Sequence, residues 1–391
     1  MDNNSFKYII VGAGLAGASA VDGIREIDKS GTILLVGLED YLPYNRPPLS
    51  KKLWLGKEKM QDIFIHDQSF YDNAHVTLLL KTKVTAIESS NKKIICNNGN
   101  IYTYEKILLA TGGEPRQLSI PGGDLQGIAY FRNLNDYLFL KEQAREGSIA
   151  LVIGGGFIGS EIAAALRMNK VEVTMIFPDK YLAQKVFPES LGRATQEMYL
   201  ERGIKISSED LPTSVEKTTS GFVTSTRSGK KIETNMIIVG VGLNPSVDLA
   251  KNSGLKIENG IFVNEYLQSS QADIFAAGDN ANYPSFILDQ RVRNEHWDNA
   301  IAQGKLAGKN MAGAFLTYDY MPYFYSDLFE FGYEAVGEID SKLETVVEWE
   351  KENEKGIIYY LRDRQTRGVM MCNVWNKLPW ARNLIKQGVR K

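Results

Sequence analysis

The chain contains few thiols and few imidazoles. Its 391 residues include two cysteines and three histidines. Cys96 and Cys372 lie far apart in the sequence and form no C-x-x-C or C-x4-C motif, which argues against a disulfide framework and against a catalytic dithiol. Three histidines (His66, His75 and His296) are too few to favour a histidine-rich metal site. The chemistry is therefore expected to come from bound organic cofactors.

A long apolar run and a strong excess of one charge are also missing. No stretch reaches the roughly 18–20 apolar residues of a membrane helix, and residues 1–5 lack the basic and apolar regions of a secretory signal peptide. Lys and Arg number 45 and Asp and Glu 47, so the net charge of −2 gives no general attraction for nucleic acid or an anionic membrane. We expect a cytoplasmic protein of two or three domains, with no membrane span and no nucleic-acid partner.

The sequence around residues 150–161 carries a nucleotide-binding pattern. Gly154, Gly156 and Gly159 form G-x-G-x-x-G between four apolar residues and a run of good helix formers. Glycines there permit a tight turn and a close approach of the backbone to a pyrophosphate, which the positive end of the helix faces. The next apolar strand ends near Asp179, which can bind the ribose of NAD and would repel a 2′-phosphate. The pattern predicts an NADH site, and the adjacent Lys180 weakens the discrimination against NADPH.

A first copy of the pattern lies near the N-terminus. Gly12, Gly14 and Gly17 again follow an apolar strand and precede a helix, and Glu39 and Asp40 follow the next strand. Two copies in one chain predict two dinucleotide sites. One nucleotide would donate hydride, and the other would be a tightly held redox carrier.

The order of the expected elements is repeated in the two halves of the chain. Each half has a glycine turn, a helix, an antiparallel meander (82–105 and 204–232) and a buried strand (107–113 and 236–242). Such self-similarity favours two nucleotide-binding domains of one kind. After residue 318 the character changes to short strands and a helix, which suggests a third, α+β domain; these elements are expected over 334–339, 345–350, 356–361, 368–375 and 378–387.

These residues resemble a known family. Together with the two glycine patterns, the motifs Ala110-Thr-Gly-Gly and Ala276-Ala-Gly-Asp are similar to those of the pyridine-nucleotide-dependent flavoprotein oxidoreductases built on the glutathione-reductase plan. The loop Asn45-Arg-Pro-Pro-Leu-Ser-Lys resembles the ferredoxin-reductase and apoptosis-inducing-factor branch. The segments Tyr325-Ser-Asp-Leu and Gly332-Tyr-Glu-Ala-Val-Gly resemble apoptosis-inducing factor and its prokaryotic relatives.

The resemblance implies an α/β, glutathione-reductase-like fold with two Rossmann-type domains and a C-terminal α+β interface domain. An FAD domain would comprise residues 1–118 and 241–317, an NAD domain 119–240, and the interface domain 318–391. By the same resemblance, the glycine finger with two arginines would hold the FAD pyrophosphate, Asp279 the ribityl chain, and three aromatic rings would border the isoalloxazine. The residues implied for FAD are Gly12, Ala13, Gly14, Leu15, Ala16, Glu39, Arg46, Lys51, Val84, Arg132, Asp279, His296, Trp297 and Tyr325.

The resemblance also implies an NAD site and shows two departures from the family pattern. Leu38 stands where the family usually has its FAD-ribose acid, so that role passes to Glu39. Tyr325 stands where many relatives have Trp. The residues implied for NAD are Gly154, Gly155, Gly156, Phe157, Ile158, Glu161, Asp179, Gly242 and Glu295.

Lys51 and Glu161 are the predicted catalytic residues. A flavin that accepts hydride gains negative charge, which a fixed cation such as Lys51 would stabilise. Taken alone, Lys51 is best interpreted as a solvated lysine, and Glu161 could equally be an acid in the first helical turn. In the family these two positions form an ion pair beside the flavin, and the resemblance implies the same here.

The predicted function is transfer of hydride from NADH to FAD and of electrons to an external acceptor, such as a ferredoxin, a rubredoxin or a quinone. The absence of a cysteine near Lys51 argues against dithiol-relay and cysteine-sulfenate relatives. The alternative is a redox sensor like apoptosis-inducing factor. In such a sensor, a stable flavin–NAD charge-transfer complex controls either the formation of a homodimer or the binding of a partner. The basic C-terminus is either a solvated helix face or a surface for an acidic redox protein; its residues are Lys377, Arg382, Lys386, Arg390 and Lys391.

Overall fold

A computed structural model describes residues 4–389 of the chain. Its contacts divide the chain into two compact units, each assembled from three segments. The first unit comprises Met1–Asn45, Gln61–Glu114 and Pro245–Tyr323, and the second comprises Arg46–Met60, Pro115–Asn244 and Phe324–Lys391. Residues 1–3, and Arg390 and Lys391 of the basic C-terminus, lie outside the described residues.

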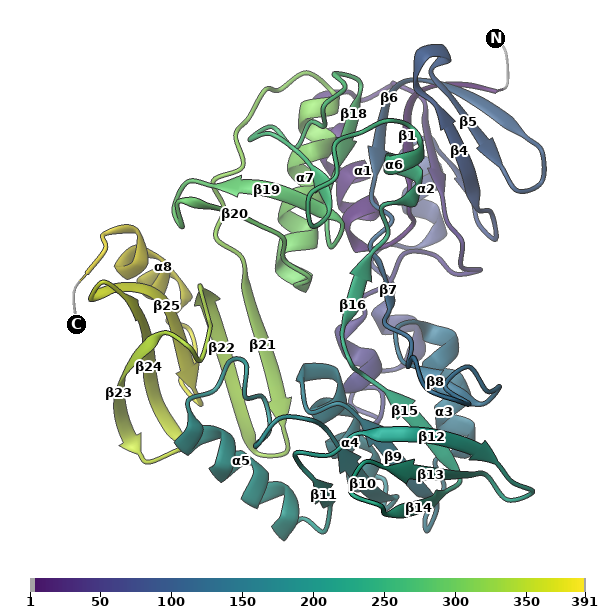
Figure 1. Cartoon of the computed structure of the whole chain (residues 1–391). Coiled ribbons are helices and arrows are strands. Elements are labelled where there is room, and N and C mark those ends of the chain that lie inside the picture. The colour runs from purple at the N-terminus through teal and green to yellow at the C-terminus, as the bar shows by residue number, and fades with distance from the viewer. Residues whose placement is uncertain (1–3, 390–391) are drawn as a thin grey trace. The chain divides into compact units, whose positions relative to one another are not determined.

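The first unit is built on a seven-stranded sheet. Its order is β3-β2-β1-β6-β5-β4, with β18 also paired to β6 (Figure 1). Pairing is parallel among β3, β2, β1, β6 and β18, and antiparallel through β5 and β4. These strands are β1 (Ser5–Val11), β2 (Ile33–Val36), β3 (Val76–Leu79), β4 (Val84–Glu88), β5 (Lys93–Cys96), β6 (Ile101–Leu109) and β18 (Ile274–Ala276). Strands β2 and β18 and the C-terminal ends of β1 and β6 are apolar and buried, as expected for a sheet covered on both faces.

Two long helices of the first unit, α1 (Leu15–Ile27) and α7 (Trp297–Met311), pack against each other and against this sheet. Glycines permit the close approach, because a Cβ on Gly23 would come within 2.0 Å of the Lys305 carbonyl oxygen and one on Gly304 within 2.2 Å of that of Ala16. The remaining elements are α2 (Gln68–Asn73), α6 (Asp248–Asn252), β17 (Ile261–Phe262), β19 (Ala281–Ser285), β20 (Gln290–Val292) and the short 3₁₀ helices η2 (Met60–Ile63) and η3 (Ser89–Asn91).

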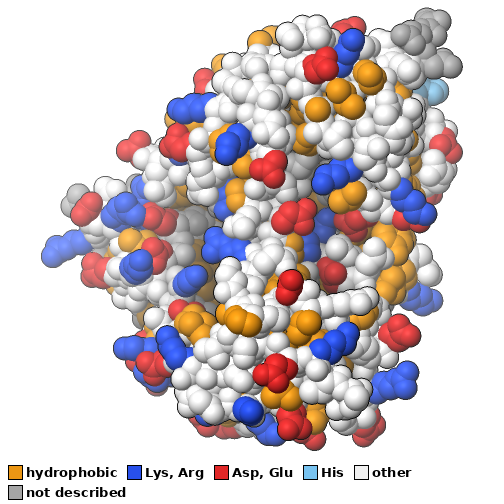
Figure 2. Space-filling model, turned by 45° about the vertical axis from the view of Figure 1, so that its right-hand side comes forward, with side chains coloured by type: hydrophobic (Ala, Val, Ile, Leu, Met, Phe, Trp, Pro, Cys, Tyr) orange, Lys and Arg blue, Asp and Glu red, His pale blue; other side chains and the backbone are white. Residues whose placement is uncertain are grey.

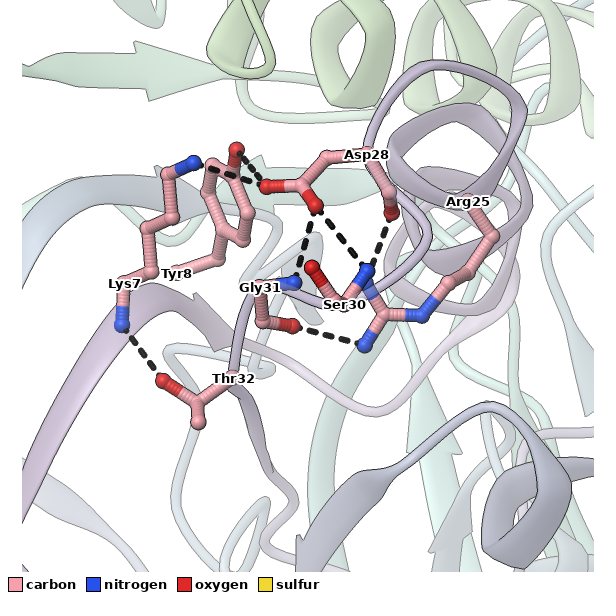
Figure 3. Close-up of polar contacts among 7 residues, drawn as sticks. All are labelled: Lys7, Tyr8, Arg25, Asp28, Ser30, Gly31 and Thr32. Atoms are coloured by element: carbon pink, nitrogen blue, oxygen red, sulfur yellow. Dashed lines mark hydrogen bonds and ion pairs between the residues drawn. The ribbon is translucent and has the colours of Figure 1, made fainter.

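A polar cluster joins the end of α1 to the start of β2 (Figure 3). The Asp28 carboxylate accepts hydrogen bonds from the backbone N–H groups of Ser30 and Gly31 at 3.0 and 2.8 Å. It also accepts from the Tyr8 hydroxyl at 2.9 Å and the Lys7 ammonium at 2.8 Å. These donors lower the pKa of Asp28 well below its usual range, so the carboxylate remains charged in the folded protein.

The second unit contains a five-stranded parallel sheet of order β11-β10-β9-β15-β8. One face packs on helices, and an antiparallel meander covers the other through an apolar core that includes Leu151, Val215, Phe222 and Ile237. The strands of this region are β8 (Ile128–Tyr130), β9 (Ile149–Ile153), β10 (Glu172–Ile176), β11 (Lys205–Ser207), β12 (Pro212–Lys217), β13 (Phe222–Thr226), β14 (Lys231–Thr234) and β15 (Met236–Val239). Its helices are η1 (Pro47–Ser50), α3 (Leu134–Gln143), α4 (Phe157–Met168) and α5 (Glu189–Glu201).

The second unit also contains a C-terminal sheet of order β21-β22-β25-β24-β23, with helix α8 packed on β22 and β25 (Figure 1). Its elements are β21 (Tyr323–Leu328), β22 (Phe331–Gly337), β23 (Glu344–Lys351), β24 (Lys355–Arg362), β25 (Gln365–Cys372) and α8 (Leu378–Lys386). The chain passes between the units after Asn45, after Met60, within β7 (Gly113–Pro115), within β16 (Leu243–Pro245) and at the start of β21.

The predicted α/β fold is confirmed, as are both meanders and the four C-terminal strands with their helix. Strand β21 was not predicted, because its buried polar Ser326 interrupts the apolar alternation that identifies a strand. The division into FAD, NAD and interface domains stays a prediction. None of the helices within residues 4–389 is both long and apolar enough to cross a membrane. Figure 2 shows acidic and basic side chains intermingled on the face displayed, in keeping with the net charge of −2.

Candidate functional site

In the first unit, the turn after β1 has the geometry of a nucleotide cradle. Gly12 has a φ of +119°, and a Cβ there would lie 2.2 Å from the Ala110 carbonyl oxygen. Gly14 is the N-cap residue of α1, has no side chain that could cap the helix, and has open space around its Cβ position. A Cβ on Gly17 would lie 2.0 Å from the Gly12 carbonyl. The turn therefore leaves the first N–H groups of α1 accessible to an anion; the predicted residues on it are Gly12, Ala13, Gly14, Leu15 and Ala16.

The acids predicted for FAD follow the carboxyl ends of strands in the same unit. The Gly12 N–H donates to the Val36 carbonyl at 2.8 Å, so the residues after β2 begin beside the glycine turn. Here Glu39 accepts from the Tyr44 hydroxyl at 2.5 Å, whereas Leu38 is 63% exposed. Asp279 follows β18 and is buried. Folds of this kind bind ligands at the carboxyl ends of their parallel strands, at the point where the strand order reverses.

His296 and Trp297 stand at the start of α7 in the first unit. Burial lowers the pKa of His296 to about 4, although the charge of Asp279 acts in the opposite direction. The imidazole is therefore neutral at physiological pH. The indole N–H of Trp297 donates to the Asn45 side chain at 2.7 Å, which fixes the orientation of the ring. Val84, also predicted for FAD, begins β4 and is buried in the core of this unit.

In the second unit, the turn after β9 repeats the geometry of the first. Gly154 has a φ of +121°, and a Cβ there would lie 2.3 Å from the Gly240 carbonyl oxygen. Gly156 is the uncapped N-cap of α4 with open space around its Cβ position, and a Cβ on Gly159 would lie 2.1 Å from the Gly154 carbonyl. Gly155 packs on the ring of Phe177. This turn also fits a pyrophosphate; the predicted residues on it are Gly154, Gly155, Gly156, Phe157 and Ile158.

The other residues predicted for NAD are distributed over both units. Asp179 follows β10 and is half-buried, with its carbonyl accepting from the Glu209 N–H at 3.1 Å. Gly242 has a φ of +108° and its carbonyl accepts from the Arg116 N–H at 3.0 Å. Glu295 belongs to the first unit, where it pairs with Arg293 at 2.7 Å.

Two arginines predicted for the FAD pyrophosphate meet in the second unit. The Arg46 guanidinium donates to the Arg132 carbonyl at 2.7 Å, and the Arg132 N–H donates to the Asp136 carboxylate at 2.8 Å. Asp136 is part of a capping box with Asn133 at the start of α3. The helix cap thus fixes the backbone to which Arg46 is bound.

Lys51 and Glu161 form an ion pair in the second unit, with 3.0 Å between Nζ and Oε1. Their side chains are 10% and 5% exposed, so this is a buried pair. The Lys51 ammonium also lies 4.2 Å from the centroid of the Tyr325 ring and 3.5 Å from the Tyr325 carbonyl oxygen. The prolines of η1 restrict the backbone just before Lys51, and α4 supplies Glu161. The pairing predicted from the family resemblance is present.

Two hydroxyl groups at this ion pair were not predicted. Ser50 and Ser326 both donate to the Glu161 carboxylate, at 2.5 and 2.6 Å. Both lie within motifs that identify the family, but nothing in the sequence distinguishes a serine that binds a carboxylate from one that turns a loop. Within the described residues, no group of three or more His, Cys, Asp or Glu side chains could hold a metal ion.

The chain is similar to known flavoprotein reductases along nearly its whole length. Residues 6–304 match the pyridine nucleotide-disulphide oxidoreductase family, and residues 307–355 and 347–387 match the C-terminal domain of mitochondrion-associated apoptosis-inducing factor. It is 35% identical to apoptosis-inducing factor 1 of Dictyostelium discoideum, over 98% of this chain and 79% of that protein. It is 31% identical to the ferredoxin–NAD(+) reductase component of the anthranilate 1,2-dioxygenase system of Burkholderia cepacia, over 97% and 94%.

A solved structure has the same fold. The chain is similar to putidaredoxin reductase in its covalent complex with putidaredoxin, with a TM-score of 0.92 and 28% sequence identity. The match covers 99% of this chain and 94% of that one.

Proposed function

The chain belongs to the pyridine nucleotide-disulphide oxidoreductase family, and from that premise we propose which nucleotide each of its two glycine turns binds. The turn at Gly12 binds FAD and the turn at Gly154 binds NADH. The protein is an NADH-dependent FAD oxidoreductase, in which hydride passes from NADH to FAD and electrons then leave for an external acceptor. FAD supplies the conversion of a two-electron donor into single electrons.

The buried Lys51–Glu161 pair is the observation on which the proposed mechanism rests. Glu161 holds the Lys51 ammonium at 3.0 Å in a site shielded from water. A fixed cation in such surroundings stabilises negative charge that develops on a neighbouring group more strongly than a solvated one would. We propose that Lys51 stabilises the reduced cofactor and that Glu161 sets the position of Lys51.

A small iron–sulfur protein of the ferredoxin type is the proposed acceptor. The B. cepacia relative is a ferredoxin–NAD(+) reductase, and the structural relative was crystallised with putidaredoxin. Cys96 and Cys372 are free and buried, and burial raises the pKa of both thiols, which does not suit them to an internal thiol relay. A quinone is the second candidate acceptor of the same electrons.

The likeness to apoptosis-inducing factor favours a second function. In it, slow reduction by NADH yields a persistent flavin–NAD state that changes partner binding or formation of a homodimer. The match over the C-terminal domain and the 35% identity with the D. discoideum protein support this alternative. We propose a cytoplasmic location for either function, because that compartment supplies NADH.

The test is rapid anaerobic mixing of the purified flavoprotein with NADH, followed by oxidised ferredoxin or ferricyanide. A reductase loses its flavin absorbance within seconds and regains it promptly on addition of the acceptor. A sensor is reduced slowly, develops a long-wavelength band and resists the acceptor. Absence of flavin bleaching with NADH contradicts both functions.

A further inference from the structure

The Glu161 carboxylate is held by more than its lysine partner. Oε2 accepts from the Ser50 hydroxyl at 2.5 Å, and Oε1 accepts from the Ser326 hydroxyl at 2.6 Å and from Lys51 Nζ at 3.0 Å. Both serines are buried, with exposed fractions of 3% and 1%. Each carboxylate oxygen thus has a hydroxyl donor of its own. A carboxylate fixed at both oxygens cannot rotate about its terminal bond without losing a hydrogen bond in a site that water does not reach.

The register of β21 against α4 places Ser326 at this carboxylate. Phe324 and Ser326 share one face of β21, because alternate residues of a strand point the same way. Phe157 and Glu161 share one face of α4, because residues four apart are neighbours on a helix. The Phe324 and Phe157 rings contact each other with 5.1 Å between centroids, and Ser326 meets Glu161 two strand positions and one helical turn further on. The aromatic pair therefore sets the position of the polar one.

The C-terminal sheet also places a buried phenol where the charge of Glu161 acts on it. Tyr333 on β22 is 1% exposed. Burial and the charge of Glu161 raise the pKa of Tyr333 well above its usual value, so the phenol keeps its proton. A serine hydroxyl has one proton, and that of Ser326 goes to Glu161. Ser326 therefore acts toward Glu161 as a hydrogen-bond donor, beside a phenol that stays neutral.

We propose that Ser50 and Ser326 are positioning residues for hydride transfer, acting on the Lys51 ammonium through Glu161. This inference rests on the proposed function. With both serines present, Glu161 has one orientation and so offers Lys51 one position. With either serine removed, the carboxylate can rotate, and Lys51 can turn toward the Tyr325 carbonyl and ring that lie 3.5 and 4.2 Å away.

The test compares Ser326→Ala and Ser50→Ala with the wild-type flavoprotein. We expect the limiting rate of flavin reduction by NADH to fall about tenfold or more, equal to about 1.4 kcal/mol, while FAD content and the NADH dissociation constant stay close to wild type. Ser326→Thr, which keeps the hydroxyl, should restore the rate. In a Glu161→Gln background, Ser326→Ala should cost little further, because groups that act through one another are not additive.

A second readout does not depend on turnover. In the protein without NADH, Lys51 should react faster with an acylating reagent in both serine variants than in wild type, as mapped by mass spectrometry with Lys52 as the internal reference. Thr366→Val is the matched control. It removes a buried hydroxyl of the same C-terminal sheet that donates to the Val389 carbonyl at 2.9 Å, and it should change neither readout.

Each outcome bears on the proposal. Wild-type reduction rates and wild-type Lys51 acylation in both serine variants overturn it, as does a loss from Ser326→Ala that persists in full beside Glu161→Gln. If Ser326→Ala fails to retain FAD, then the reduction rate and the Lys51 acylation rate of Ser50→Ala decide whether the proposal holds. Failure of the wild-type protein to be reduced by NADH contradicts the proposed function instead, and the acylation rates still test the positioning.

Discussion

The Lys51 ammonium and the Glu161 carboxylate lie 3.0 Å apart in a buried site, although the two residues are distant in the sequence. Separating such charges by mutation leaves one of them unpaired, which in buried pairs costs about 3–5 kcal/mol. The buried arrangement is stable because the hydroxyl groups of Ser50 and Ser326, together with Lys51, stabilise the negative charge of Glu161. The free-energy cost of burying this ion pair is explained if the charge of Lys51 is needed for catalysis.

Replacement of Lys51 should affect flavin reduction far more than FAD binding. We expect Lys51→Ala to slow reduction by NADH about a hundredfold, the scale on which a preorganised electrostatic contact acts. FAD content, measured from the absorbance ratio of flavin to protein, should change little. The control is Lys52→Ala, which removes the next lysine, exposed and paired with Glu58. Equal losses of rate and of FAD in Lys51→Ala would contradict a catalytic role.

Asp179 should control the choice between NADH and NADPH. Its carboxylate follows β10 at the edge that carries the second glycine turn, where it would repel a 2′-phosphate. Asp179→Ser should raise the ratio of kcat/KM for NADPH over NADH by about tenfold or more. Glu172→Gln, at the opposite end of the same strand, should leave the ratio unchanged. An unchanged ratio in Asp179→Ser would show that another residue reads the ribose.

The cluster around Asp28 should contribute to stability and make that contribution dependent on pH. Asp28→Asn keeps the shape but removes the charge that binds Lys7 and three further donors, which should cost about 2 kcal/mol at pH 7. Folding lowers the pKa of Asp28, so this stabilisation is full above the usual value near 4 and is lost as the pH falls below it. The difference in unfolding midpoint between variant and wild type should therefore narrow from pH 6 to pH 3. Asp40→Asn, in an exposed pair with Lys81, should lower the midpoint far less.

Local patterns in the sequence predict the parts of the site made by one segment. The turns at Gly12 and Gly154 follow from strand, glycine and helix signals that lie side by side, and both have the expected backbone geometry. The Lys51–Glu161 pair joins distant segments, and only the family resemblance indicates it. The bond from Ser326 depends on the packing of Phe324 against Phe157, and the bond from Ser50 depends on the packing of η1 against α4. No local pattern encodes either contact. Contacts that depend on how distant segments pack together cannot be predicted from local sequence patterns.

His296 should make the protein less stable as the pH falls below 7. Burial lowers the pKa of His296 to about 4, while an unfolded chain takes up a proton near pH 6.5. The folded state therefore loses stability on acidification between those two values, by roughly 1.4 kcal/mol per pH unit. From pH 7 to pH 5 we expect the unfolding midpoint of the wild type to fall more than that of His296→Gln. Parallel curves for the two proteins would mean that the imidazole is solvated.

Substitutions at the two glycine turns should separate the two nucleotides. In Gly12→Ala, the new Cβ meets the Ala110 carbonyl, so we expect loss of FAD and a colourless protein. In Gly154→Ala, the corresponding contact with the Gly240 carbonyl should leave FAD bound but raise the NADH concentration needed for half-maximal flavin reduction. Gly99→Ala is the control for backbone strain alone, because Gly99 has a φ of +83° but open space around its Cβ position. If Gly154→Ala lost FAD and Gly12→Ala kept it, the assignment of the two turns would have to be exchanged.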